Sequence, residues 1–279
     1  MHRVIHELPT PEAMARELRQ ALPEFAACHW VDTTTSTNND LMAMARDQGD
    51  MVAWPRLIGA HHQTQGKGRL GRAWLDTPGM SLMFSCGFAL PLAQPSSQGL
   101  QGLGPAIGLV SVQTLRTQVD HPDEIKVKWP NDLMVGHGKV GGVLIEATIK
   151  SDVQFVIIGI GLNLAGHTAL SSTLSREIGA IGQRLRSSTS LPQVVAALAN
   201  CWHDALVLNA RAGFEPFVDG FGKLDYLAGL TVDLIQQDQL IATGTACGAG
   251  PDGRLQVKTA RGTESFMVGD VSVRTKHPI

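Results

Sequence analysis

The stretch EIKVKWPNDLMVGHGKVGGVLIEATIK, residues 124–150, indicates how the body of this protein folds. It starts with lysines that alternate with apolar residues, which is typical of an edge-like strand with two different faces. Pro130 ends that strand, and Asn131-Asp132 makes a polar turn. The glycine-containing turn at residues 136–138 joins the two strands of the stretch. We therefore predict neighbouring strands with a polar turn between charged side chains.

The flanking sequence predicts an α/β body around these strands. QFVIIGIGLNL (154–164) is the most strand-like run in the chain, and MVAWPRLIGAHHQT (51–64) and MSLMFSCGFAL (80–90) also indicate buried strands. Capping residues and helical spacing predict four helices, over residues 11–22, about 37–49, 107–119 and 191–208. We expect the Pro-, Ser- and Gly-rich segment from Pro91 to Pro105 to be a mobile loop.

The pattern of residues along the sequence changes after KLDYLAG, residues 223–229. Short β-like segments follow one another, separated by turns such as Pro251-Asp252-Gly253. This pattern predicts two domains: an α/β domain over residues 1–226 and a small all-β barrel over residues 227–279.

Composition excludes several classes of function. With 279 residues and a net charge of −2, the chain has no global attraction for nucleic acid or an anionic membrane. Its four cysteines are far apart, which favours reduced thiols in a cytoplasmic protein. We find no targeting segment and no apolar run long enough to span a membrane.

A loop with the sequence QTQGKGRLGRAW, residues 63–74, combines glycines with cationic residues. Ordering glycine costs conformational entropy, and neighbouring cations repel one another. Both costs are explained if an anionic ligand approaches the backbone closely and orders the loop. The alternative is a solvated basic surface loop. The spacing fits neither a P-loop nor a dinucleotide-binding fingerprint.

Four further clusters each have a functional and a structural interpretation. Polar Ser36-Thr37-Asn38 exceeds what one helix cap needs, although capping is the ordinary role of such residues. The turn in KWPNDL, and Lys139 before two glycines, could border a ligand or simply end strands. Asn163, in GIGLNL, needs buried partners and could anchor either a ligand or a loop. The histidines lack metal-ligand spacing, so no metal site is predicted.

Together, in the order in which they occur along the chain, these five segments resemble the biotin–protein ligases (biotin–[acetyl-CoA-carboxylase] ligases). The resemblance covers roughly residues 30 to 274 and implies a mixed sheet flanked by helices, like that of class II aminoacyl-tRNA synthetases, followed by an SH3-like barrel. It also implies two reactions. Biotin and ATP give biotinyl-5′-AMP and pyrophosphate; a lysine of a biotin carboxyl carrier protein then takes the biotin and releases AMP. Mg²⁺ is expected with ATP.

Matching to the family's motifs assigns expected site residues. Arg69, Lys139 and Asp132 are the expected catalytic residues. The expected biotin-binding residues are Ser36, Thr37, Asn38, Gln63, Gly66, Lys67, Gly68, Arg69, Lys139, Gly141 and Gly142. The expected ATP-binding residues are Arg69, Arg72, Trp74, Asn131, Lys139, Asn163 and Arg274.

Two departures from the family pattern limit what the resemblance implies. Lys67 stands where the family often has Arg, which predicts a modest effect on retention of the adenylate. The sequence also lacks the N-terminal winged helix-turn-helix of ligase-repressors, so DNA binding is not expected. Monomer and homodimer both remain open. The rival interpretations are a lipoate–protein ligase-like enzyme and a non-catalytic module that binds protein or RNA through its β tail.

Overall fold

A computed structural model describes residues 7–92, 100–165, 178–267 and 272–275. Its main element is a seven-stranded sheet with the order β1-β2-β3-β7-β6-β5-β4. Strands β1 and β2 pair in parallel, and the other neighbours pair antiparallel, so the sheet is mixed as predicted. The strands are β1 (Ala27–Thr34), β2 (Arg56–Gln63), β3 (Ser81–Pro91), β4 (Ile125–Lys128), β5 (Asp132–Val135), β6 (Gly138–Lys150) and β7 (Val153–Asn163).

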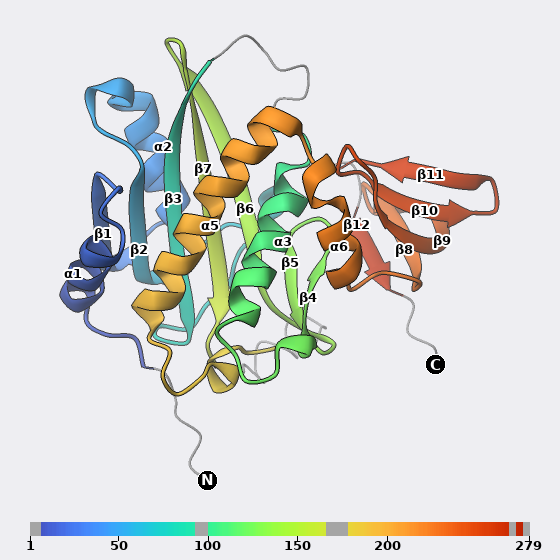
Figure 1. Cartoon of the computed structure of the whole chain (residues 1–279), viewed down its shortest axis with the longest axis horizontal. Coiled ribbons are helices and arrows are strands. Elements are labelled where there is room, and N and C mark those ends of the chain that lie inside the picture. The colour runs from blue at the N-terminus through green and yellow to red at the C-terminus, as the bar shows by residue number, and fades with distance from the viewer. Residues whose placement is uncertain (1–6, 93–99, 166–177, 268–271, 276–279) are drawn as a thin grey trace.

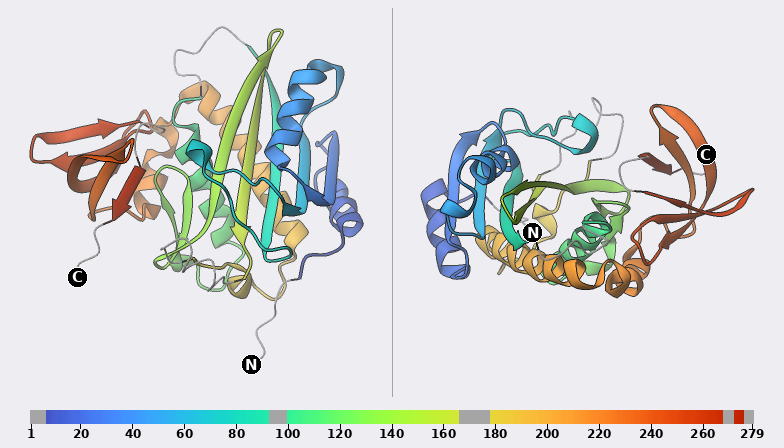
Figure 2. Two further views of the ribbon diagram at one scale, coloured as in Figure 1. Left: turned by 180° about the vertical axis from the view of Figure 1, so that it is seen from behind. Right: turned by 90° about the horizontal axis from the view of Figure 1, so that it is seen from above.

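Helices cover the two faces of this sheet unequally (Figures 1 and 2). Helices α3 (Leu103–Arg116) and α5 (Leu191–Ala212) pack together over one face, and α1 (Pro11–Ala21) packs beside α5 and β1. Helix α2 (Thr37–Asp47) lies on the opposite face, against β2, β3, β6 and β7. Short 3-10 turns complete the body, at η1 (Gly49–Met51), η2 (Arg69–Gly71), η3 (Pro122–Glu124), η4 (Gly182–Arg184) and η5 (Glu215–Phe217).

Helices α1 and α5 begin at residues whose side chains cap them. Thr10 Oγ1 accepts a hydrogen bond from Ala13 N ahead of Pro11, and Ser190 forms a reciprocal capping box with Gln193. The prediction for α3 was wrong at its start, because the helix begins at Leu103 rather than residue 107. Gly102, with φ 74°, makes the turn into that helix, a conformation that glycine adopts without strain.

The segment expected to be a mobile loop is therefore only partly a loop. Pro91 belongs to β3, and Leu103 to Pro105 belong to α3. Residues 93–99 lie outside the described residues, so the expectation of mobility is not tested there.

The body has one large apolar core, between the sheet and α1, α3 and α5. Trp202 of α5 stacks on Phe84 of β3 with ring centroids 5.1 Å apart, and both side chains are fully buried. The Trp202 indole donates to Ser111 Oγ of α3 at 2.8 Å, so its polar atom is also satisfied. This packing fixes the sheet on which the site is built.

The C-terminal segment forms a five-stranded antiparallel sheet with the order β11-β10-β9-β8-β12. It lies beside the β4 end of the large sheet, next to the short helix α6 (Val218–Leu224) that precedes it (Figure 1). The all-β tail was predicted, whereas α6 was missed. The strands are β8 (Thr231–Gln236), β9 (Gln239–Ala249), β10 (Leu255–Thr259), β11 (Gly262–Phe266) and β12 (Ser272–Thr275).

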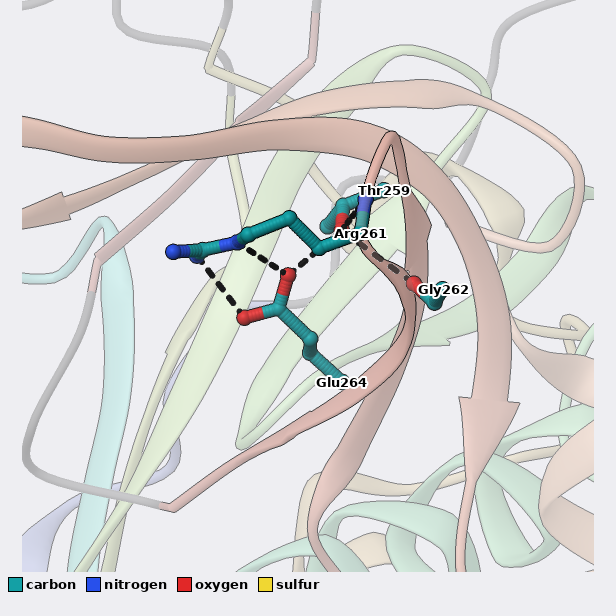
Figure 3. Close-up of polar contacts among 4 residues, drawn as sticks. All are labelled: Thr259, Arg261, Gly262 and Glu264. Carbon is teal, nitrogen blue, oxygen red and sulfur yellow. Dashed lines mark hydrogen bonds and ion pairs between the residues drawn. The ribbon is translucent and has the colours of Figure 1, made fainter.

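The outer hairpin of this small sheet is closed by a polar cluster (Figure 3). Arg261 Nε and Nη2 donate to the two carboxylate oxygens of Glu264 at 3.1 and 2.9 Å. Thr259 Oγ1 also donates to Glu264 Oε1 and lowers the pKa of that carboxyl group together with Arg261. This exposed cluster stabilises the turn between β10 and β11.

The two sheets are joined by buried contacts around Trp129. Its indole Nε1 donates to Gly253 O of the β9–β10 turn at 3.0 Å. Gly102 packs against that turn so closely that a Cβ at Gly253 would lie 2.6 Å from Gly102 Cα. Nearby, the backbone of Val127 in β4 forms an isolated parallel β-bridge with the backbone of Asp225. The predicted strand with alternating lysines and the polar turn after it, residues 126–132, therefore lie at the junction of the two sheets.

Asp225 itself is a buried carboxyl group at this junction. Its Oδ1 accepts a hydrogen bond from Leu227 N at 2.9 Å, and its Oδ2 has no hydrogen-bond partner among the described residues. Burial raises the pKa of Asp225 to about 6, against the smaller opposing effects of that hydrogen bond and Lys126.

No helix in the described part of the chain is long and apolar enough to cross a membrane.

Candidate active site

A cleft of about 480 Å³ brings together most of the residues that the sequence singled out. It lies beside the N-terminus of α2, between the glycine-rich loop and strands β5, β6 and β7. Thirteen of the predicted residues line it: Ser36, Thr37, Asn38, Gln63, Lys67, Gly68, Arg69, Arg72, Trp74, Asn131, Asp132, Lys139 and Gly142.

The glycine-rich loop folds back on itself between β2 and β3. Gly68 N donates to Arg72 O at 2.7 Å, and Trp74 N donates to Gly66 O at 2.9 Å. A Cβ at Gly66 would lie 2.8 Å from Trp74 O, so the close backbone approach requires glycine there. Gly66 therefore shapes the loop without lining the cleft.

Lys67 connects this loop to helix α2. Its Nζ donates to Asn39 Oδ1 at 2.8 Å. The contact is exposed, so it is weak on its own. It nevertheless holds the loop toward the helix N-terminus that carries Thr37 and Asn38.

Two cations meet two residues of the Asn131-Asp132 turn on the floor of the cleft. Arg69 Nη1 donates to Asn131 Oδ1 at 3.0 Å, and Lys139 Nζ donates to Asp132 Oδ1 at 2.5 Å. Asn131 is in turn held by its amide, which donates to Val143 O of β6. The loop and two strands thus bring both cations to one place, as the sequence predicted.

Arg69 is poised to receive an anion. Burial lowers the pKa of its guanidinium below the usual range, Asp132 opposes that shift, and Arg72 adds to it. Arginine remains charged in proteins despite such shifts. Its Nη2 is buried and has no hydrogen-bond partner among the described residues. A carboxylate or phosphate oxygen would satisfy that donor.

The other end of the cleft is a chain of hydrogen-bonded polar side chains, of which Thr37, Asn38 and Ser85 are buried. Gln63 Oε1 accepts from Thr37 N at 2.8 Å, and Thr37 Oγ1 lies 2.7 Å from Ser85 Oγ. Ser85 Oγ donates to Asn38 Oδ1 at 2.6 Å, and Asn38 Nδ2 donates to Glu146 Oε2 at 2.8 Å. These groups can recognise a small polar ring.

Sequence reasoning missed Ser85 and Glu146. Ser85 lacks the sequence context of a catalytic nucleophile, but that is the wrong criterion for a hydrogen-bonding residue. Its position gave a clue: a serine within the apolar run MSLMFSCGFAL is fully buried on β3 and therefore needs partners.

The two glycines of the GIG segment on β7 make room for side chains of the site. A Cβ at Gly159 would overlap Asn38 Oδ1 and lie 2.9 Å from Ser85 Oγ. A Cβ at Gly161 would lie 2.5 Å from Cε2 of the Trp74 indole. Glycine within a strand indicates either a β-bulge or the close approach of another group. There is no bulge here, because β7 pairs with β3 in continuous register, so close approach is the explanation.

Three other predicted residues support the cleft from outside its lining. Gly141 lies under Gly161 O, which a Cβ would approach to 2.6 Å. Asn163 Nδ2 donates to Lys139 O at 3.4 Å and to Gly179 O at 3.2 Å, so it anchors backbone near Lys139. Arg274 is exposed on β12, although its neighbour Val273 lines the cleft.

A second cavity of about 400 Å³ adjoins the first and shares Arg69, Asn131 and Val143 with it. Its other walls come from residues 100–104, from β6 and from the β9–β10 turn at Asp252–Arg254. In the described residues, no group of three or more His, Cys, Asp and Glu side chains is arranged to hold a metal ion.

Comparison with known proteins shows which family this chain resembles. A family model described as the Biotin/lipoate A/B protein ligase family matches residues 30–163, just under half of the chain. Outside that match, the chain continues through α5, α6 and the C-terminal sheet. All the predicted site residues except Arg274 lie within the matched segment.

Individual relatives agree with the family model. The chain is 30% identical over 220 residues to the bifunctional ligase/repressor BirA of Escherichia coli. That alignment covers 77% of this chain and 65% of BirA, so the chain spans just under two thirds of the relative's length. It is 34% identical over 135 residues to the biotin–[acetyl-CoA-carboxylase] ligase of Mycobacterium tuberculosis, covering 48% of each chain.

Solved structures agree on the fold. The biotin protein ligase of Aquifex aeolicus, in complex with biotin and ATP, superposes with a TM-score of 0.72 at 24% identity. The match covers 90% of this chain and all of that one. The predicted fold, a mixed sheet flanked by helices with a C-terminal β domain, is therefore confirmed.

Proposed function

We propose that this chain is an ATP-dependent biotin–protein ligase. It forms biotinyl-5′-AMP and pyrophosphate from biotin and ATP, then transfers biotin to a lysine of a biotin carboxyl carrier domain of a carboxylase. The observation that carries this proposal is a single cleft with a buried polar pocket at one end and the cations Arg69 and Lys139 at the other. The match of residues 30–163 to the family model and the names of the relatives support it.

The polar pocket suits the ureido ring of biotin. That ring offers one carbonyl acceptor and two N–H donors. Thr37, Ser85 and Gln63 present hydroxyl and amide groups within the cleft. A ring without such groups would leave the remaining donors and acceptors of these side chains without partners, at a cost of about 1–3 kcal/mol each.

The cationic end suits the first reaction. A biotin carboxylate oxygen attacks the α-phosphorus of ATP, and the bond to the pyrophosphate oxygen breaks. Both reactants are anions, so catalysis needs positioning and charge neutralisation more than covalent chemistry. Arg69 can fork onto the carboxylate or the α-phosphate, and Lys139, held by Asp132, supplies a second positive charge.

The same groups suit the second reaction. The carrier lysine nitrogen attacks the carbonyl carbon of the anhydride, the bond to the AMP oxygen breaks, and the nitrogen loses a proton. We assign to Asp132 the orientation of Lys139 and of the incoming lysine. The glycine-rich loop closes over the adenylate and keeps water from hydrolysing it.

ATP arrives with Mg²⁺ on its phosphates. Mg²⁺ in such sites is held mainly by substrate phosphates and water, with few protein ligands. Trp74, Asn131 and Arg72 line the cleft and are the residues proposed for the nucleotide, with Asn163 and Arg274 beside it. We also propose that residues 1–226 form the catalytic domain and residues 227–279 an SH3-like domain.

Two alternatives are weaker. The dithiolane ring of lipoate has no N–H or carbonyl group to pair with the chain from Gln63 to Glu146. A non-catalytic binding module would not need a partly buried Arg69 whose buried Nη2 has no protein acceptor in the described residues. Both alternatives remain outcomes of the experiment below.

The experiment is transfer of biotin to a purified carrier domain with ATP and Mg²⁺, read by streptavidin blot. Wild type is compared with Arg69→Ala, Lys139→Ala and the control Arg16→Ala, whose side chain is exposed on α1. Labelling by wild type and the control that is lost in both site variants supports the proposal. No labelling by wild type, when a known ligase labels the same carrier, overturns it and directs the test to lipoate.

A further inference from the structure

The polar chain beneath the ring pocket ends at a residue that does not line the cleft. Glu146 of β6 borders the second cavity, and its Oε2 accepts a hydrogen bond from Asn38 Nδ2 at 2.8 Å. Asn38 and Ser85 are buried, and the site glycine Gly159 leaves just enough space for their contact. The chain therefore runs from a carboxylate to the pocket through tightly packed groups.

A carboxylate at one end fixes the direction of every hydrogen bond in the chain. A carboxylate accepts hydrogen bonds and donates none, so Asn38 must turn its NH₂ group toward Glu146. The amide oxygen of Asn38 then faces Ser85, whose hydroxyl proton is used to donate to it at 2.6 Å. Ser85 can thus only accept from its other neighbour.

The direction continues to Thr37. The contact of 2.7 Å between Thr37 Oγ1 and Ser85 Oγ allows either atom to donate when considered alone. Thr37 Oγ1 also lies within donating distance of Gln63 Oε1, at 3.2 Å. Since the Ser85 proton is already used, the shorter contact of 2.7 Å would bring two lone pairs face to face unless Thr37 donates its single hydroxyl proton to Ser85. Thr37 Oγ1 therefore keeps its lone pairs available as an acceptor within the cleft.

We infer that Glu146 is a positioning residue that sets this hydrogen-bond direction and so selects a ligand that donates an N–H group to Thr37. The inference rests on the proposed function and deepens it: Glu146 contributes to ring recognition without contact with the ring. With the opposite direction, the Thr37 hydroxyl would point its proton at the ligand N–H, and the two donors would conflict.

A double-mutant cycle tests the direction itself. Asn38→Asp places two carboxylates within hydrogen-bond distance and removes the donor to Glu146. Glu146→Gln allows the Asn38 amide to adopt either orientation. The double variant Asn38→Asp/Glu146→Gln restores the direction, because the new amide at position 146 donates to the new carboxylate at position 38. That carboxylate still accepts from Ser85.

The measurement is biotin-dependent exchange of pyrophosphate into ATP, with KM for biotin and kcat determined separately. We expect Asn38→Asp to raise KM for biotin on the order of tenfold or more and Glu146→Gln by roughly two- to fivefold. The double variant should return to within about threefold of wild type. Because ring binding is remote from the reacting carboxylate, kcat and KM for ATP should change little.

Other outcomes identify which claim fails. Losses that multiply in the double variant mean that Glu146 serves packing only and overturn the inference, provided melting temperatures stay close to that of wild type. Should one variant melt early, calorimetric titration of biotin below its melting temperature replaces the kinetic assay. Wild type without biotin-dependent exchange instead overturns the proposed function, since the inference is about differences among active variants.

Discussion

Lys139 Nζ lies 2.5 Å from Asp132 Oδ1, and the two residues extend from adjacent strands, β6 and β5, into the same cleft. The ion pair fixes the ammonium group, while the partly buried guanidinium of Arg69 donates to the neighbouring Asn131. A positive charge fixed in advance stabilises a developing anion more than one that must reorient during the reaction. This relationship leads to the first prediction.

Replacing Lys139 by Met keeps most of its volume and removes its charge. We expect kcat for biotin-dependent pyrophosphate exchange to fall by about 10²–10³, as for other preorganised donors. Asp132→Asn keeps the ammonium but loosens it, so a loss of about tenfold is expected. If Lys139→Met keeps kcat within about threefold of wild type, the lysine does not act on the reaction.

Arg69 is predicted to require its fork as well as its charge. Arg69→Lys retains a cation but loses the planar guanidinium group. In the wild type, Nη1 of that group donates to Asn131, and Nη2 is buried without a hydrogen-bond partner among the described residues. We expect kcat/KM for biotin to fall by about 10²-fold. Lys67→Arg is the matched control in the same loop and should stay within about threefold or retain the adenylate better. Equal effects of the two changes would contradict a special role for Arg69.

The two glycines of β7 are predicted to affect different substrates. Gly159→Ala pushes against Asn38 and should raise KM for biotin about tenfold or more. Gly161→Ala pushes against the Trp74 indole and should act mainly on KM for ATP. Gly222→Ala, in α6 with open space around it, is the control and should leave both constants unchanged. If both strand-glycine variants changed the same KM, biotin and ATP would not occupy separate ends of the cleft.

Asp225 predicts a pH dependence of stability. Its folded-state pKa of about 6 lies above the ordinary value of 3.8, so the folded protein binds this proton more tightly than the unfolded chain. Its contribution is therefore greatest below about pH 4 and is lost as pH rises toward 6. Asp225→Asn should raise the free energy of unfolding at about pH 7.5 by about 1–3 kcal/mol and have no such effect near about pH 4.

Urea denaturation at several pH values measures this difference. Asp219→Asn, at an exposed position on α6, is the control and should show no pH-dependent gain. A gain from Asp225→Asn that is the same in acid as at neutral pH would mean that titration of Asp225 is not its cause.

The glycine-rich loop is predicted to become protected when both substrates bind. Lys67 and Arg72 are exposed and offer trypsin sites within it. Biotin with MgATP should slow cleavage after these residues at least several-fold, because the loop orders over the adenylate. Biotin without ATP should protect less. Cleavage at an unchanged rate with both substrates would contradict closure of the loop.

Much of the fold was predictable because its local patterns are strong. The stripe of Met14, Leu18 and Leu22 is fully buried, as helical spacing required. The capped start of α1 and the start of α5 at Leu191 also followed from sequence. The early start of α3 did not, because Gly102 lies in a left-handed turn that only tertiary contacts with Phe214 and Asp252 make evident.

The site was predictable where residue types are unusual and not where they are ordinary. Glycine, arginine and lysine concentrated in one loop indicate an anion, whichever fold surrounds them. Ser85 and Glu146 are common residue types in strands. Their roles depend on β3 and β6 each facing α2, a relationship between segments up to 108 residues apart. Spacing along the sequence cannot reveal it.

The hydrogen bond from Trp129 to Gly253 has a consequence for the order in which the protein matures on the ribosome. The partners are separated by 124 residues, so at ordinary translation rates roughly 6–25 s pass between their synthesis. Once Asn163 has been made, well before Gly253, the nascent chain contains every strand of the large sheet and the basic loop, while the Trp129 indole still awaits its acceptor. We therefore expect substrate binding to mature late in synthesis, after the last turns of the small sheet have emerged.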